Sequence, residues 1–507
     1  MSDQTSSLWV GTTRDTAFSS LEGPLDVDVA VVGAGIAGIT AAFLLKRAGK
    51  SVALIDSKRV VRGATGYTTA KVSVAQGLAY SKVLKNFGED GARLYAEANQ
   101  AGFDLISELI ETERIECEFE PKTNYVYAET AGERSLIEAE VRAARVAGLA
   151  ANLTTAVPLP FPVHCAFQLE NEAQFHPRKY LLPLASAVDG DGSHVLELTR
   201  VLDVEQDERL RLLTDRGPVT SADVILASHL PILDRGFFFA KAHPERSYVV
   251  AARIGVDQEP EGMYINVGRP TRSIRTARDA QGPLLLLGGE GHKPGTEPET
   301  DARYEALKEF GRRHWAIEDF PFRWSTQDYM PVDGVPYVGR LTRRSEHIHV
   351  ATGFQKWGMT NGSVAAIILA DLILGRQNPW AKLYDSKRIK LLASGPRVIK
   401  ENAAVARHFL LDRLHRGADS PLSMLPAGEG RLTRVGGHKI AAFRDDEGRL
   451  HTLSPACTHL GCHVSWNPAE RSWDCPCHGS RFSGSGSVIN GPATRDLEQR
   501  LVDREEA

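Results

Sequence analysis

Apolar and polar residues near the start of the chain follow a strand–turn–helix–strand order. The run DVAVVG at 28–33 is short, apolar and rich in β-branched residues, which is typical of a buried parallel strand. IAGITAAFLLKRAG at 36–49 has apolar residues at helical spacing, and Gly49 is placed to end that helix. SVALID at 51–56 predicts a second buried strand. The pattern therefore predicts the start of a parallel α/β sheet.

The turn between the first strand and the helix carries glycines in G-x-G-x-x-G spacing. Such glycines permit a tight turn, let a pyrophosphate approach the helix N-terminus, and let the helix pack on the sheet. Asp56 ends the second strand, where it can accept hydrogen bonds from an adenosine ribose. The residues expected to contact a dinucleotide in this unit are Gly33, Gly35, Ile36, Ala37, Gly38, Asp56 and Ser57.

The dinucleotide can be FAD or NAD, and the number of such units favours FAD. GGEGHKPG at 288–295 is glycine-rich, but no helix with apolar periodicity follows it. A flavin reductase that uses a nicotinamide usually carries two strand–glycine turn–helix units, whereas this sequence carries one. We therefore expect bound FAD, with electrons supplied by a donor other than a nicotinamide.

Length and charge narrow the class of protein. The 507 residues correspond to roughly three domains, and the net charge of -4 gives no electrostatic reason to expect nucleic acid as a partner. The segment MSDQTSSLWVGTTRD lacks the basic start and apolar stretch of a secretory signal. The longest apolar run, 364–375, is too short to span a membrane and contains Asp371. We therefore expect a cytoplasmic protein without a membrane span.

Two short segments near the end of the chain, CTHLGC at 457–462 and CPCHGS at 475–480, hold four of the six cysteines. Each segment offers one cysteine–histidine pair at close spacing, C-x-H in the first and C-x-x-H in the second. Two thiolates and two imidazoles suit an iron–sulfur cluster with mixed ligands, and they suit tetrahedral zinc as well. The other two cysteines, Cys117 and Cys165, are expected to be buried small apolar residues.

The two cysteine segments resemble the Rieske [2Fe-2S] domain, over roughly residues 425–507. Zinc would leave the second cysteine of each loop unexplained. The resemblance implies that two cysteines hold one iron, that two histidines hold the other, and that the remaining cysteines form a disulfide between the loops. The implied ligands are Cys457, His459, Cys475 and His478, and the implied disulfide joins Cys462 to Cys477.

The resemblance also bears on the reduction potential of the cluster. In Rieske proteins of the cytochrome bc type, a serine donates its hydroxyl to a cluster sulfur, and Ser480 matches that serine. A tyrosine two positions later also donates to the cluster, but this chain has Phe482 there. One hydrogen bond fewer predicts a potential below the bc-type range.

Three further segments, RGATGYTTAK at 62–71, YMPVDGVPYVGR at 329–340 and ATGFQKWGMTNGSVAA at 351–366, accompany the N-terminal unit. Together they resemble the D-amino-acid oxidase/glycine oxidase superfamily of FAD enzymes. The resemblance implies that the first segment wraps the flavin and that the last opens a helix toward the flavin ring. The implied further FAD contacts are Arg62, Gly63, Ala64, Thr65, Gly353, Phe354, Trp357, Gly358 and Met359.

The expected architecture has three parts. An α/β FAD-binding Rossmann-like domain is interleaved with an α+β substrate domain over 1–380, and the FAD-binding parts are about 25–100, 150–235 and 330–380. A helical connector at 381–424 leads to an all-β Rieske domain at 425–507. Apolar runs predict a strand of the FAD sheet at 223–228, strands of the substrate domain at 248–256 and 283–290, and a helix at 305–315.

The combination of cofactors predicts a type of reaction. FAD accepts two electrons together as a hydride, whereas a [2Fe-2S] cluster carries one electron at a time. We expect a dehydrogenase that oxidises a small molecule and passes single electrons to an external acceptor, either a protein or a quinone. The alternative is an electron-transfer or redox-sensing protein that works with a protein partner and has no small-molecule substrate of its own.

One position indicates the substrate. In members of the superfamily that oxidise amino acids, an arginine five residues before the D-G aspartate binds the substrate carboxylate, and here that position is Asp328. A carboxylate attracts a cation, so an amine-type substrate is favoured. Alternatively, Asp328 caps a turn or pairs with Arg323. Tyr329 and His292 are weaker candidates for residues that line the flavin cavity and take part in catalysis, because each is more often a packed or solvent-exposed residue.

Overall fold

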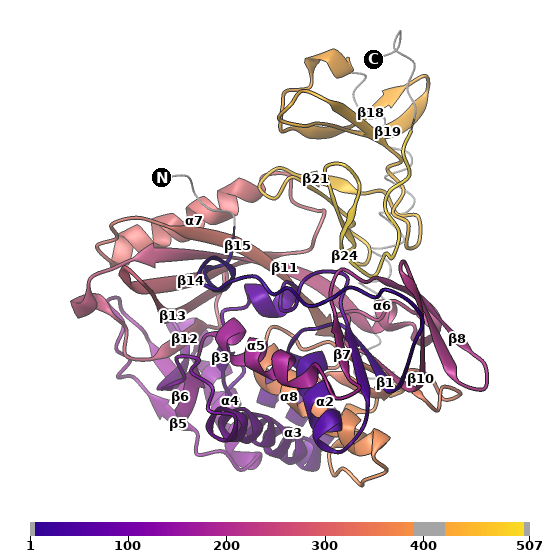
Figure 1. The fold of residues 1–507 in the computed structure, drawn as a ribbon. Helices are drawn as coiled ribbons and strands as arrows, with labels where there is room; N and C mark the ends of the chain where they lie inside the picture. Colours follow the sequence, from indigo (N-terminus) through magenta and orange to yellow (C-terminus); the bar gives the residue numbers. More distant parts are fainter. Residues whose placement is uncertain (1–5, 389–420, 501–507) are drawn as a thin grey trace.

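The computed structural model describes residues 6–388 and 421–500, which form two large sheets with their helices and a C-terminal all-β module (Figure 1). In Figure 1 the yellow part of the C-terminal module lies next to the two large sheets, and its orange part projects away from them. No helix in the described ranges is long and apolar enough to cross a membrane.

The first sheet is eight-stranded and contains the predicted dinucleotide-binding unit. Its main strand order is β16-β17-β10-β1-β2-β7, and the hairpin β8–β9 extends it from β10. The central strands β17, β10, β1, β2 and β7 are parallel, as the apolar runs predict. The strands are β1 (Leu25–Val32), β2 (Val52–Ile55), β7 (His194–Leu196), β8 (Val201–Gln206), β9 (Leu210–Thr214), β10 (Gly217–Leu226), β16 (Tyr337–Arg340) and β17 (Ile348–Thr352).

The second sheet is nine-stranded and mixed. Its order is β15-β11-β14-β13-β12-β4-β6-β3, with β5 on β6. Most pairs are antiparallel, and β12 runs parallel to β4. The strands are β3 (Lys71–Val72), β4 (Glu120–Ala128), β5 (Asn152–Thr154), β6 (Cys165–Gln174), β11 (Ala242–Arg253), β12 (Met263–Asn266), β13 (Arg272–Asp279), β14 (Gly282–His292) and β15 (Phe322–Pro331).

The two sheets interleave along the chain, but one expected boundary is wrong. Residues 150–174 were assigned to the FAD-binding part, whereas β5 and β6 in this range pair within the second sheet. Alternation of apolar and polar residues, as in CAFQLENEAQ, does not specify which sheet a strand joins.

Helices cover the first sheet and link it to the second. Helix α2 packs against α8, and α8 in turn packs against the long helix α3. The α-helices are α1 (Leu8–Gly11), α2 (Ile36–Arg47), α3 (Ala79–Thr112), α4 (Arg134–Val146), α5 (Pro177–Val188), α6 (Phe238–Lys241), α7 (Thr300–His314), α8 (Gly358–Ile373) and α9 (Ala381–Tyr384). The short 3-10 helices are η1 (Ala64–Tyr67), η2 (Ala131–Glu133), η3 (Asp234–Gly236), η4 (Val256–Gln258) and η5 (Leu422–Met424).

The C-terminal module consists of two small antiparallel sheets. Strands β19 and β20 form an antiparallel hairpin, in keeping with the all-β domain expected at 425–507. The strands of the C-terminal module are β18 (Gly430–Val435), β19 (His438–Arg444), β20 (Leu450–Leu453), β21 (Ser465–Asn467), β22 (Ser472–Asp474), β23 (Arg481–Ser483) and β24 (Val488–Asn490). The expected helical connector lies mostly at 389–420, outside the described residues; α9 and η5 stand at its two ends.

Buried polar contacts join the C-terminal module to the second sheet and α7. Arg246 of β11 is 1% exposed and pairs with Glu470 at 3.1 Å, and Tyr304 of α7 donates its hydroxyl to the same carboxylate at 2.7 Å. Thr300 donates to the Asn467 side-chain oxygen at 2.7 Å. Because buried charged groups are stabilised only when they are paired, these contacts specify one docked arrangement of the module.

Candidate functional site

A cavity of about 320 Å³ lies where the two large sheets and the C-terminal module meet. Thirteen of the sequence-predicted FAD residues line it, from the glycine turn, the segment after β2 and the start of α8. These residues are Gly33, Gly35, Ile36, Ala37, Asp56, Ser57, Gly63, Ala64, Thr65, Phe354, Trp357, Gly358 and Met359. The fold therefore brings three separated segments together on one cavity, as the resemblance implies.

The glycine turn is shaped for a ligand that approaches the backbone. Gly33 has φ +110°, and a Cβ there would lie 2.5 Å from the Ala227 carbonyl oxygen. A Cβ at Gly35, the N-cap of α2, would lie 3.0 Å from the Thr65 hydroxyl, and Gly35 offers the helix no side-chain cap. Ile36 N donates to Thr65 Oγ1 at 3.2 Å, and the glycines leave the backbone of the turn without side chains, which fits a pyrophosphate that approaches the N-terminus of α2.

Asp56 stands at the end of β2 and is held in place by two backbone amides. Its carboxylate accepts hydrogen bonds from Ala34 N and Lys58 N, both at 2.8 Å. Burial raises the pKa of Asp56 despite these two bonds. Both amides belong to the turns around the cavity, so the carboxylate is fixed where the sequence predicts contact with a ribose.

The start of α8 forms another part of the wall. Trp357 is its N-cap and offers no side-chain cap, so the first amides of the helix remain available to a ligand. The two residues before it, Gln355 and Lys356, both have positive φ, at 44° and 70°, which is uncommon for residues with a side chain. Lys356 Nζ donates to Glu245 Oε1 at 2.6 Å and to Ser247 Oγ at 2.8 Å. This turn is fixed by β11, and the helix N-terminus favours negative charge in the cavity.

Three predicted FAD residues are not among those that line the cavity, namely Gly38, Arg62 and Gly353. Gly38 lies against the Gly33 carbonyl, where a side chain would clash, so it shapes the turn. Arg62 forms an ion pair with Asp15. Gly353 has φ +80° and lies beside Pro331. Their placement supports a role in the shape of the site rather than contact with the cofactor.

Asp328 of β15 lines the cavity as a half-buried side chain. Burial raises the pKa of Asp328 to about 6, and the charge of Lys356 opposes that shift. The alternative partner Arg323 lies instead 3.4 Å from Asp301. The structure therefore presents a carboxylate to the cavity that is largely ionised at neutral pH.

Tyr329 and His292, expected at the cavity, are not among the residues that line it. The Tyr329 hydroxyl donates to the carbonyl oxygen of His478 at 2.9 Å, in the C-terminal module. His292 Nε2 lies 2.9 Å from the Tyr248 hydroxyl, and its Nδ1 lies 2.8 Å from the Lys293 carbonyl oxygen. Adjacent residues of a strand point to opposite faces, so Tyr329 cannot share the cavity face with Asp328.

The predicted cluster ligands come together at the tip of the C-terminal module. Cys457 and Cys475 are buried free cysteines, and a hydrogen bond between their sulfurs is the main cause that lowers the pKa of Cys457 to about 7. The His459 and His478 rings lie 5.1 Å apart. The buried Nδ1 of His459 has no hydrogen-bond partner, whereas its Nε2 lies 2.8 Å from Asp234 Oδ1 of η3. An unpartnered buried nitrogen of this kind fits a metal ligand whose other nitrogen is oriented by a carboxylate.

The spacing of the donors distinguishes a two-iron cluster from one zinc ion. Donors to a single tetrahedral zinc all lie within about 4 Å of one another. In the described ranges, one set of three or more His, Cys, Asp or Glu residues has ligand atoms that all lie within 4.8 Å of one another. That set is Cys462, Cys475 and Cys477, and two of these cysteines form a disulfide. The two free cysteines and two histidines do not converge in this way, which fits ligands divided between two irons.

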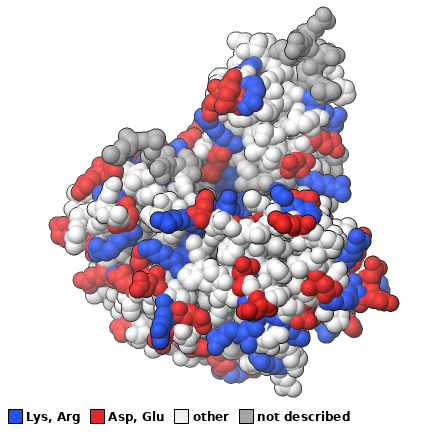
Figure 2. Space-filling view, viewed as in Figure 1, with Lys and Arg blue, Asp and Glu red and all other residues white. Residues whose placement is uncertain are grey.

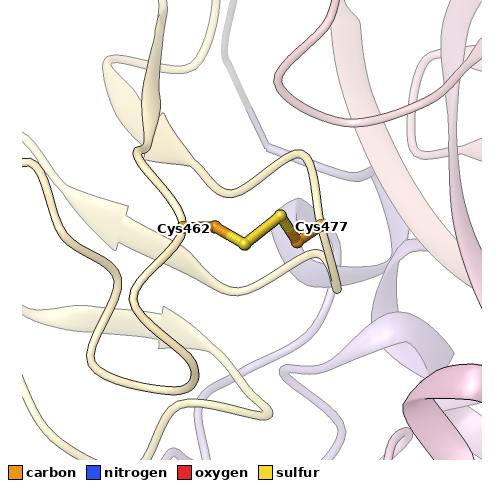
Figure 3. Close-up of a disulfide and its surroundings, with 2 residues drawn as sticks. All are labelled: Cys462 and Cys477. Atoms are coloured by element: carbon orange, nitrogen blue, oxygen red, sulfur yellow. A yellow bond between two sulfur atoms is a disulfide. The ribbon is translucent and has the colours of Figure 1, made fainter. Parts of the chain in front are cut away.

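The disulfide and the serine take the positions that the resemblance implies. Cys462 and Cys477 form a disulfide that joins the two cluster loops (Figure 3). The Ser480 hydroxyl interacts with the Cys457 thiol and accepts a hydrogen bond from Ala493 N at 3.1 Å. Phe482 is fully buried, so it offers packing but no hydrogen bond to the cluster region.

Several residues of the site were not foreseen from the sequence. Residues 488–491, 493 and 494 of the C-terminal module line the FAD cavity, and Lys58 Nζ lies 3.5 Å from Asn490 Oδ1. Lys71 also lines the cavity; it is buried and donates to the Tyr264 carbonyl oxygen, and burial lowers its pKa well below the usual lysine value. Lys71 is the last residue of the segment RGATGYTTAK at 62–71. The sequence does not show which face of β3 its side chain occupies.

Comparison with known proteins agrees with this geometry. A family model described as FAD dependent oxidoreductase matches residues 28–372, and a Rieske [2Fe-2S] domain model matches residues 418–500. YhfW of Bacillus subtilis (strain 168), named as a Rieske 2Fe-2S iron-sulfur protein, is 36% identical over 497 residues, 98% of this chain and 97% of that protein.

Two more distant relatives match the large sheets. Gamma-glutamylputrescine oxidoreductase of Escherichia coli (strain K12) is 23% identical over 395 residues, 74% of this chain and 90% of that protein. The crystal structure of glycine oxidase from Geobacillus kaustophilus matches with a TM-score of 0.60 at 19% identity, and covers 72% of this chain and all of that one. The structural match shows a shared fold.

Proposed function

The chain belongs to the FAD dependent oxidoreductase family and carries a Rieske [2Fe-2S] domain, and on that premise we propose that it is a dehydrogenase for an amine-type small molecule. When bound, FAD supplies two-electron oxidation and the cluster supplies one-electron transfer. The proposed reaction removes a hydride equivalent from the substrate and passes its two electrons one at a time to an external acceptor.

The observation that carries the proposal is the position of the cluster loops. They dock against β15, the strand that bears the cavity residue Asp328, and residues 488–491 of the same module line the cavity itself. An oxidase that gave its electrons directly to oxygen would gain nothing from this arrangement. A second redox centre beside the cavity supports a dehydrogenase.

The chain's own residues would hold FAD by backbone and polar contacts. The N-terminal amides of α2 face the position of the pyrophosphate, and Thr65 Oγ1 accepts a hydrogen bond from Ile36 N at 3.2 Å, which fixes the segment after β2 on the turn. The N-terminus of α8 stabilises negative charge at the other end of the cavity.

Asp328 supports an amine as the substrate. Its carboxylate faces the cavity and can accept a hydrogen bond from an ammonium group, whereas it would repel a substrate carboxylate at the same place. The relative from Escherichia coli is named for gamma-glutamylputrescine, which agrees with a nitrogen-containing substrate.

Anaerobic reduction of the flavin with a panel of primary and secondary amines and of simple amino acids tests the proposal. Amines should bleach the flavin absorbance and then produce the EPR signal of the reduced cluster. Bleaching by simple amino acids alone would overturn the amine assignment. Bleaching only by a reduced protein partner would favour the electron-transfer alternative.

A further inference from the structure

Strand β15 lies between part of the cavity and the second cluster loop, residues 475–480. Thr326 and Asp328 line the cavity, while Gln327 and Tyr329, at the alternate positions, are 3% and 1% exposed and contact the C-terminal module. Successive side chains of a strand point to opposite faces, so one face of β15 meets the cavity and the other meets the cluster loops.

Two hydrogen bonds fix the second cluster loop on β15. Gln327 Nε2 donates to the carbonyl oxygen of Gly479 at 2.9 Å, and the Tyr329 hydroxyl donates to that of His478 at the same distance. Both acceptors are backbone atoms at or beside a predicted cluster ligand.

The loop approaches the strand too closely for a side chain to intervene. Gly479 has φ +77°, and a Cβ there would lie 2.8 Å from Pro244 Cβ of β11 and would clash with the Gln327 amide. On the other side of the tip, the Phe239 ring lies 5.0 Å from that of His478, and Asp234 holds His459. Both histidines of the tip are thus contacted by the oxidoreductase part of the chain, while Leu460 of the first cluster loop remains exposed.

We infer that β15 is the wall through which electrons leave the FAD cavity, and that Gln327 and Tyr329 are positioning residues that hold the cluster loop on its far face. The inference rests on the proposed function. With both groups bound, FAD would supply the two electrons of one hydride and the cluster would accept them one at a time, with an external one-electron acceptor reoxidising the cluster after each and the proton released to solvent. Within the chain, Gln327 and Tyr329 would hold the second cluster loop against β15.

The experiment uses the full-length holoprotein and needs no substrate. FAD is reduced by a light flash under anaerobic conditions with a deazaflavin sensitiser, and electron arrival at the cluster is followed by absorbance and by freeze-quench EPR. The variants are Gln327→Leu, Tyr329→Phe and the double variant. Tyr80→Phe is the matched control, because Tyr80 is equally buried and donates to a backbone carbonyl, Val74 O at 3.0 Å, away from the cluster tip.

The double variant should transfer electrons from flavin to cluster about tenfold more slowly or worse, since two ordinary hydrogen bonds of docking are lost. Iron content, the cluster EPR line shape and the flavin spectrum should stay as in the wild type, and Tyr80→Phe should transfer at the wild-type rate. Wild-type transfer in the double variant would overturn the inference. If the double variant loses iron, the test uses Tyr329→Phe, which keeps the aromatic ring. Slower transfer from flavin to cluster in this variant would support the inference, and transfer at the wild-type rate would overturn it.

This result is separable from the fate of the proposed function. A substrate panel that fails to bleach the flavin would reject the amine dehydrogenase, but photoreduction would still report electron transfer across β15. Conversely, slow transfer in the wild type would reject the role of β15 and leave substrate oxidation at FAD intact.

Discussion

Replacement of Glu470 by glutamine should loosen the C-terminal module more than any surface substitution. Glu470 lies between Arg246 at 3.1 Å and Arg481 at 3.7 Å, and Arg246 is 1% exposed. Glutamine keeps the size of the side chain and removes its charge. Arg246 then loses its ion-pair partner while its positive charge stays buried, and Asp474, whose pKa the charges of Arg481 and Arg246 lower, is left to compensate it. Breaking a buried pair in this way costs about 3–5 kcal/mol.

The pKa of Glu470 gives the sign of the pH dependence. Burial would raise this pKa, but the charges of Arg246 and Arg481 outweigh burial, so the pKa is lowered in the folded protein. A lowered pKa contributes stability above the pKa of the unfolded chain, and that contribution is lost as the pH falls through the folded pKa. Wild type should therefore lose its advantage over Glu470→Gln in acid.

The assay is urea denaturation of the holoprotein, followed at the visible absorbance of the cluster so that the C-terminal module is observed separately. Glu470→Gln should lower the midpoint at neutral pH and converge with wild type as the pH falls through the lowered pKa of Glu470 in the folded protein. Glu447→Gln is the control, because Glu447 pairs with Arg449 on the surface at 70% exposure and should change nothing measurable. A loss of less than about 1 kcal/mol in Glu470→Gln would refute the reasoning that this ion pair anchors the module.

Three further substitutions test single residues of the site. Asp328→Asn should raise KM for amine substrates at least about tenfold, since a charge-assisted hydrogen bond is lost. In the wild type, KM should rise as the pH falls below about 6, and the variant should lack that rise. A variant with the pH profile of the wild type would contradict the assigned role. Lys71→Met should raise the urea midpoint, because an apolar side chain of similar length replaces a buried amino group bonded to the Tyr264 carbonyl oxygen. The expected gain in the free energy of unfolding is about 1–3 kcal/mol, and a lower midpoint would contradict this. Phe482→Tyr should raise the reduction potential of the cluster in an EPR-monitored redox titration by restoring a hydrogen bond, whereas an equal or lower potential would show that Phe482 does not set it.

The local pattern of the sequence was sufficient for the elements that build the FAD site. The β-branched run at 28–33, the glycine spacing and Asp56 predict one continuous strand–turn–helix–strand unit, and the structure forms it as β1, α2 and β2. The resemblance of the two cysteine segments to the Rieske domain implies the cluster loops and the disulfide between them, and the structure forms that disulfide.

Long-range placement could not be predicted from those patterns. The alternation in β15 is visible in the sequence, but its phase is not, so Tyr329 was expected at the cavity and lies on the opposite face. The contact of residues 488–494 with the cavity depends on how the C-terminal module docks. Docking is specified by scattered partners such as Arg246, Glu470 and Thr300, which share no sequence motif.

The face of the molecule seen in Figure 2 adds little to the choice of electron acceptor. Acidic and basic side chains are interspersed over the face seen in Figure 2, in keeping with the net charge of -4. A mixed surface of this kind does not steer one strongly charged partner. Acceptor specificity is therefore best examined by direct reoxidation of the reduced holoprotein with quinones and with small redox proteins.

Iron, zinc, acid-labile sulfide and FAD should be quantified on the purified full-length protein, with EPR recorded before and after anaerobic photoreduction. We predict two irons and two sulfides per FAD, and a Rieske-type EPR signal that appears once the flavin is reduced. Protein that holds zinc without acid-labile sulfide, or iron that stays EPR-silent after full flavin reduction, would contradict a flavin and an iron–sulfur centre working in one chain.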